Sequence, residues 1–167
     1  MQDAVDRVLA QWHEERPDVD VSPMGVVGRI SRAARTLERG LQTEFARHGL
    51  QPWEFDILAT LRRTGPPYEL TAGALAASSM VTSGAITNRI DRLVARGLVT
   101  REVDPDNRRA VRIGLTPEGR RLVDDTLPHH VANEATLLEP LSPAERDRLA
   151  QLLRKLLAGH ESGPAQD

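Results

Sequence analysis

The chain has no cysteine among its 167 residues. This absence excludes disulfides, thiolate nucleophiles, cysteine-ligated zinc and thiol redox sensing. No apolar run approaches the roughly 18 residues that a membrane span requires. The N-terminal stretch MQDAVDRVLAQWHEERPD is charged throughout and has no apolar signal-peptide core. We therefore expect a cytoplasmic protein with no membrane partner.

The sequence also lacks the motifs of common enzyme classes. There is no glycine-rich phosphate loop after a strand, no HExxH, and no nucleophile–base spacing. Asp125 and His129 stand four residues apart on one predicted helix and would form half of a zinc site. A solvated polar face explains them more simply. We expect a protein that is not an enzyme and that has neither cofactor nor metal.

Positive charge is scarce overall but locally concentrated. The formal net charge is −2, yet residues 89–112 contain seven arginines against four acidic residues. A basic segment on an acidic body suits DNA binding in one orientation. A solvated charged face is the alternative interpretation of this segment.

Residues 70–115 have the order of a winged helix–turn–helix: a short helix, a turn, a second helix and a hairpin. We expect Leu70 and Leu75 on the apolar face of the first helix. Thr82 or Ser83 is placed to cap the second helix. The fold class that follows is mostly α, with a small β-hairpin wing and a helical frame.

The second helix has one apolar stripe and one polar face. Its stripe repeats at spacings of four and three residues, and consists of Ile86, Ile90 and Leu93. Thr87 and Asn88 fall on the opposite face, with Arg92 beside them. This is the pattern of a helix that packs on its own core and reads DNA with its outer side.

The hairpin follows directly. Residues 98–100 and 111–113 are predicted strands, joined by the turn-forming residues 104–107. Arg108 and Arg109 stand just past that turn, where long cations reach phosphate or a narrow minor groove.

The expected partner is therefore double-stranded DNA. The expected contact residues are Ser83, Thr87, Asn88, Arg92, Arg108 and Arg109. A helical hairpin with a solvated loop, or a winged helix that contacts only proteins, are the alternatives. Paired arginines at the hairpin tip argue against the second, because a purely protein-binding wing does not need them.

The remaining segments read as amphipathic helices around one domain, residues 1–167. We assign residues 52–115 to DNA binding, and residues 2–48 and 116–158 to a helical dimerisation region. Their apolar faces need a second surface, and a homodimer supplies one together with the two-fold axis of a palindromic operator. The alternative is that these helices complete a monomeric core.

Three motifs give the chain a family resemblance: TNRIDRLVARGLV at 87–99, DPDNRR at 104–109 and LTPEGR at 115–120. With them the chain resembles MarR-family transcription regulators over nearly its whole length. The resemblance implies a dimeric winged-helix repressor, occasionally an activator, that small ligands release from DNA. Asn107 departs from the pattern, since the family commonly has an aspartate there that braces the wing arginine.

A narrower resemblance is to the urate-responsive branch of that family, marked by an extra N-terminal helix with a tryptophan. The stretch LPHH at 127–130 also looks like this branch. The resemblance implies ligand-binding roles for Trp12, Asp56, Arg89 and Arg101. The implied effector is a small planar anion such as urate or a related purine, phenolate or carboxylate.

The residue pattern itself is compatible with a site there. Arg89 borders the buried stripe of the second helix, and Asp56 borders the inward face of the helix that contains Trp53. A partly buried cation and carboxylate must be paired or solvated. A salt bridge between Asp56 and Arg89 is one solution. A flat anion that stacks on Trp12 and accepts from the arginines is the other.

Overall fold

A computed structural model describes residues 2–78, 86–103, 107 and 110–161. The elements follow in the order α1 (Ala4–Glu15), α2 (Ser22–Arg47), α3 (Pro52–Arg63), β1 (Glu69–Thr71), α4 (Ala72–Ser78), α5 (Ile86–Ala95), β2 (Val99–Val103), β3 (Val111–Leu115), α6 (Pro117–Leu137) and α7 (Pro143–Glu161). The structure is mostly helical with one small sheet, as the sequence predicted. No helix within the described ranges is long and apolar enough to cross a membrane.

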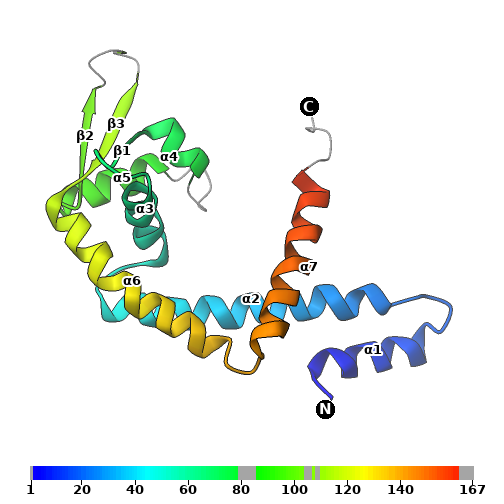
Figure 1. Cartoon of the computed structure of the whole chain (residues 1–167). Coiled ribbons are helices and arrows are strands. Elements are labelled where there is room, and N and C mark those ends of the chain that lie inside the picture. Colours follow the sequence, from blue (N-terminus) through cyan, green and yellow to red (C-terminus); the bar gives the residue numbers. More distant parts are fainter. Residues whose placement is uncertain (1, 79–85, 104–106, 108–109, 162–167) are drawn as a thin grey trace.

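The 26-residue helix α2 is the longest described helix and connects the two ends of the molecule. Figure 1 shows α1 beside one end of α2, and α3, α4, α5 and the sheet gathered at the other end. Glycines allow α1 to approach closely, because a Cβ on Gly28 would lie 3.3 Å from Val5 Cγ1. Arg29 then pairs with Asp3 at 2.9 Å and with Asp6 at 2.6 Å.

The sheet has the antiparallel order β1–β3–β2, and this corrects one prediction. Leu70 was expected on the first helix of the motif, but it lies in β1 opposite Ile113 of β3. Helix α4 starts two residues later, at Ala72. Strand β1 is only three residues long, so its own sequence pattern is a weak signal for a strand. It is a strand because it pairs with β3, more than 40 residues further along the chain.

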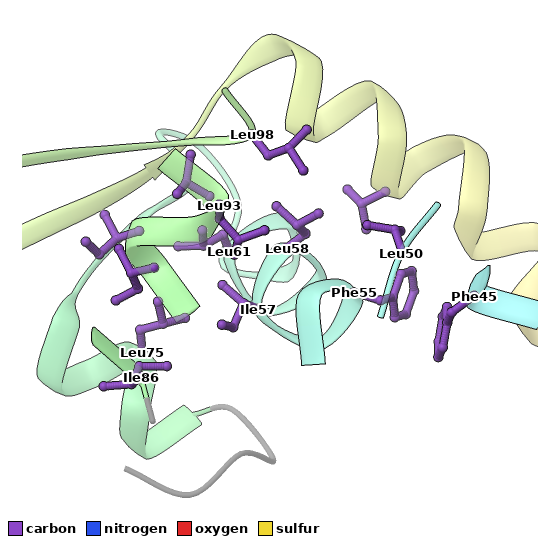
Figure 2. Close-up of a cluster of buried hydrophobic side chains, with 14 residues drawn as sticks. Phe45, Leu50, Phe55, Ile57, Leu58, Leu61, Leu75, Ile86, Leu93 and Leu98 are labelled. Carbon is purple, nitrogen blue, oxygen red and sulfur yellow. The ribbon is translucent and has the colours of Figure 1, made fainter. Parts of the chain in front are cut away.

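The core lies between the C-terminal end of α2, α3, α4, α5, the sheet and the start of α6. Ile57, Leu58 and Leu61 of α3 are fully buried (Figure 2). The predicted stripe of α5 packs against them, with Ile86, Ile90 and Leu93 all buried. Such burial fixes which side of α5 faces outward.

The predicted cap of the second helix, Thr82 or Ser83, lies outside the described residues, but two other helix ends have clear turn and cap chemistry. Gly97, two residues past the end of α5, has a φ of 70°, a conformation that favours glycine. Thr116 caps α6 by accepting a 2.9 Å hydrogen bond from the Gly119 amide. Gly119 in turn packs so closely on the Leu98 carbonyl that a Cβ there would clash. These contacts hold α6 to the base of the hairpin.

Apolar side chains remain exposed along α7. Leu149, Leu152, Leu156 and Leu157 are 41–59% exposed in the single chain. Four neighbouring apolar side chains on one helix are more than the scattered exposed residues expected of a monomer. This face of α7 is therefore available to a second surface.

Candidate nucleic-acid interface and ligand groove

Helix α5 presents a polar surface on the side opposite its buried stripe. Thr87 and Asn88 are exposed, as the sequence predicted for the face opposite the apolar stripe. Arg92 is exposed too, and its guanidinium lies 5.0 Å from the ring centre of Trp53. Arg92 therefore lies at the boundary between the outward face of α5 and α3.

Contacts of Arg96 anchor the C-terminal end of α5. Arg96 Nη1 donates a 2.8 Å hydrogen bond to Glu54 of α3, and Arg96 Nη2 donates to the Gly49 carbonyl at 3.1 Å. Glu54 is 3% exposed, so this ion pair is buried on the carboxylate side. It ties α5 to the corner between α2 and α3.

Three predicted DNA-contact residues, Ser83, Arg108 and Arg109, lie outside the described residues. The structure does describe the strands on either side of the arginines. Val103 at the end of β2 pairs with Val111 at the start of β3. The arginines therefore belong to the connection between two paired antiparallel strands.

A groove of about 770 Å³ runs between α2, α3 and α6. Phe45, Phe55 and Trp53 give it apolar walls, while Asp56 and His130 supply polar groups. The His130 ring lies 4.8 Å from the Phe45 ring and 4.9 Å from the Phe55 ring. Its Nδ1 is buried and has no hydrogen-bond partner among the described residues. A mostly apolar cavity with a few directed polar groups is typical of small-molecule sites.

Arg89 does not line this groove itself, but it lies against the ring of Trp53, which does. Its guanidinium lies 5.5 Å from the ring centre of Trp53, which lines the groove one helical turn before Asp56. Arg89 Nη1 is buried and lacks an acceptor within the described part of the chain. A buried guanidinium N–H without an acceptor is costly, and an anion would satisfy it.

The four residues implied by the urate-branch resemblance are not all together in one chain. Asp56 and Arg89 flank Trp53, whereas Arg101 on β2 pairs with Asp91 at 2.6 Å. Trp12 lies on α1, which occupies the opposite end of α2 from the winged region (Figure 1).

The aromatic ring beside Arg89 is that of Trp53, a residue for which neither the sequence pattern nor the resemblance implied a ligand role. The available signal was its position, three residues before Asp56 on the same helix. Arg92, which also faces this ring, was assigned only to DNA.

Comparison with known proteins identifies relatives over most of the chain. A sequence profile described as MarR family matches residues 48–110. The HTH-type transcriptional regulator PecS of Dickeya dadantii (strain 3937) is 40% identical over 152 residues, which cover 91% of this chain and 92% of PecS. These relatives are transcription regulators, in agreement with the expectation that the chain is not an enzyme.

Two solved structures resemble the fold. Sco3205, a MarR family transcriptional regulator from Streptomyces coelicolor solved in complex with DNA, is 25% identical with a TM-score of 0.77 over 84% of this chain and 89% of its own. Bordetella bronchiseptica BpsR, whose DNA binding is regulated by 6-hydroxynicotinic acid, is 29% identical with a TM-score of 0.71 over 78% of this chain and 91% of its own.

Proposed function

Because the chain belongs to the MarR family of transcription regulators, we propose that it is a repressor that binds a palindromic operator as a homodimer and is released by a small planar anion. Residues 52–115 contact the DNA in this proposal. Residues 2–48 and 116–158 form the dimer.

The observation that carries the DNA-binding proposal is the orientation of α5. Its apolar stripe is buried against α3, so Thr87 and Asn88 face outward, toward the major groove of a bound duplex. Arg108 and Arg109 of the wing contact the backbone or the minor groove beside it. The structure of Sco3205 with DNA supports this assignment by likeness.

The effector proposal rests on Arg89. The buried Nη1 of Arg89 has no acceptor among the described residues. The guanidinium lies 5.5 Å from the ring centre of Trp53, which lines the groove, and Arg89 belongs to the helix that we assign to DNA. An anion bound there would contact Arg89 directly and shift α5 relative to α3. Control of BpsR by 6-hydroxynicotinic acid supports a planar aromatic acid as the chemical class.

In the dimer that we propose, Trp12 and Arg101 also belong to the effector site. Since α1 lies far from the winged region of its own chain, we assign the stacking ring to Trp12 of the partner subunit. Arg101 would break its ion pair with Asp91 and donate hydrogen bonds to the anion. Asp56 is the carboxylate whose contacts change when the anion binds. The effector must prefer the conformer that cannot bind DNA, because equal affinity for both would shift nothing.

The DNA-binding proposal is tested by titrating full-length protein into duplex DNA at several salt concentrations. We expect a steep loss of affinity with salt through counterion release. Replacing Arg108 and Arg109 with alanine should weaken binding to all sequences. Replacing Arg32 and Arg35 of α2, which removes the same charge elsewhere, should have a much smaller effect.

If the Arg108/Arg109 variant binds as tightly as the parent, the wing assignment is wrong. If the parent binds no duplex at low salt, the protein-interaction alternative is correct. The effector proposal is tested separately, by adding urate, 6-hydroxynicotinic acid or salicylate to a preformed complex. Release by a planar acid, but not by acetate at equal ionic strength, is the expected result.

A further inference from the structure

We propose that Glu44 and His48 of α2, together with His129 of α6, form a binding site for a divalent transition metal ion. Their ligand atoms, one oxygen and two ring nitrogens, all lie within 4.8 Å of one another. The site lies at the C-terminal end of α2 and is separate from the outward face of α5. The proposal does not depend on DNA binding or on the effector.

The two ligands on α2 are already at coordination spacing. Glu44 and His48 are four residues apart and therefore share one helix face. Glu44 Oε1 lies 3.3 Å from His48 Nε2. Two ligands about 2.0–2.1 Å from a tetrahedral Zn²⁺ are separated by about 3.3 Å, so this pair matches one edge of the tetrahedron.

His129 supplies the third ligand from α6. Its ring centre lies 5.0 Å from that of His48. Two imidazoles bound to one tetrahedral ion through about 2.0 Å bonds have ring centres about 5 Å apart, so the rings already have suitable spacing. Because His129 is exposed, its side chain can rotate to bring its nitrogen into place without displacing the core.

The electrostatic surroundings favour a cation. Glu44 is only 7% exposed, and Arg47 Nη1 holds its Oε2 at 2.8 Å. This leaves Oε1 directed toward His48 and fixes the carboxylate, as hydrogen bonds to ligand carboxylates do in metal sites. The site also lies at the C-terminus of a long helix, the negative end of its dipole. The nearby charge of Arg47 opposes binding, and its exposure of 71% lets solvent screen it.

The donor set determines the class of metal. Two imidazoles and one carboxylate suit Zn²⁺, Co²⁺, Ni²⁺ or Cu²⁺, whereas Mg²⁺ and Ca²⁺ prefer oxygen ligands throughout. Three protein ligands would leave one tetrahedral position for water. A bound ion would link the end of α2, which leads into α3, to α6, which follows the wing.

The site is tested with Co²⁺, whose visible absorption reports its coordination. Full-length, tag-free protein is treated with a chelator, dialysed, and titrated with CoCl₂ and in parallel with ZnCl₂. We expect one ion per chain, tetrahedral Co²⁺ bands that Zn²⁺ displaces, and no competition by Mg²⁺. The thermal midpoint should rise with free metal, because an ion that binds the folded state stabilises it.

Three variants locate the site. H129Q changes an exposed ligand and should reduce affinity about tenfold or more without unfolding the chain. E44Q should do the same, with circular dichroism as a check on folding because Glu44 is buried. D125N is the matched control: Asp125 lies one turn before His129 on α6 but outside the cluster, so affinity should not change.

Retention of full Co²⁺ affinity by H129Q would overturn the proposal, as would loss of binding in D125N but not in E44Q. H13Q and H160Q serve as controls for adventitious binding by surface histidines of α1 and α7. If those variants, rather than H129Q, abolish the signal, the ion binds elsewhere.

Discussion

Arg96, one residue past α5, donates a 2.8 Å hydrogen bond to the buried carboxylate of Glu54 on α3. The pair joins the helix assigned to DNA reading to the helix that lines the ligand groove. Glu54 Oε2 also accepts from the Gln51 amide at 2.8 Å, so the carboxylate is anchored from two sides. The pair adds one charged contact to the apolar core that α3 and α5 share.

Replacing Arg96 with methionine should destabilise the protein. Glu54 is 3% exposed and would lose a charged partner, while it keeps the Gln51 amide. We expect a loss of about 1–3 kcal/mol in the free energy of unfolding, measured by urea denaturation. The double variant R96M/E54Q should lose less than the sum of the two single changes. Equal midpoints for R96M and the parent would show that the pair contributes nothing.

The outward face of α5 should determine base preference and not stability. Thr87 and Asn88 are exposed, so T87A and N88A should change the free energy of unfolding by less than about 0.5 kcal/mol. At the DNA, a lost base contact should relax discrimination by about 1–3 kcal/mol at one position of each half-site. Selection from a randomised duplex pool measures this, with Q151A on α7 as the control. Unchanged preference in both variants would remove α5 from the major groove.

Local periodicity was sufficient to predict α5. Its stripe needs only one helix and one core, and Ile86, Ile90 and Leu93 are buried as expected. Leu70 was misplaced because strand β1 exists only through its pairing with β3. A residue pattern within one segment contains little information about a partner that far along the chain.

Contacts between separate elements were predicted less completely for the same reason. Asp56 and Arg89 were singled out from sequence, but Trp53, the ring between α3 and α5, was not. His129 was considered with Asp125 on its own helix, whereas the structure places it beside Glu44 and His48 of α2. Neither contact follows from helical spacing, because each depends on how two helices cross.

Variants of the two tryptophans test the two parts of the proposed effector site independently. In W12F the remaining emission comes from Trp53, and in W53F it comes from Trp12. If the anion binds beside Arg89 and stacks on Trp12 of the partner subunit, it should quench emission in both variants. W12F should bind DNA normally but respond poorly to the effector, because only the stacking ring is altered.

Fluorescence titration after inner-filter correction measures the quench, and release of labelled DNA measures the response. D56N is the companion variant for the carboxylate of the groove. Full release by the effector in both W12F and D56N would place the binding site elsewhere in the molecule.

The exposed face of α7 should hold the proposed dimer. Leu152 and Leu156 lie one turn apart and are 49% and 45% exposed in the single chain. Replacing both with glutamate should dissociate the dimer, because four charges would be buried across the two-fold axis without partners. The control replaces Gln151 and Lys155, which have the same spacing on α7, with glutamate.

Light scattering after gel filtration gives the mass of each variant at micromolar concentration. We expect a monomer or an aggregate for the leucine variant and a dimer for both the control and the parent. A monomeric parent, or an intact dimer in the leucine variant, would contradict the assignment of α7 to the interface.

Acid should release α1 from α2 before the winged region unfolds. The pKa of Asp3 lies below its ordinary value of 3.8 because the Asp6 amide donates to its carboxylate, with further hydrogen bonds from Val5 and Arg29. The pKa of Asp6 is also lowered, mainly by the Asp3 amide and then by Arg29. Carboxylates with lowered pKa values stabilise the folded state above their ordinary pKa, and this contribution is lost as pH falls through the lowered values.

Replacing Arg29 with methionine should move that loss to higher pH, since both carboxyl groups would return toward their ordinary pKa of 3.8. Hydrogen exchange of the α1 amides, followed from pH 6 downward, measures the docking of α1. In R29M the protection of α1 should disappear at a higher pH than in the parent. The pH profile of α3 should be the same in both proteins, because the ion pairs of Arg29 join α1 to α2 and do not involve α3. Identical pH profiles for α1 in the two proteins would show that apolar packing around Val5, and not these ion pairs, holds the helix.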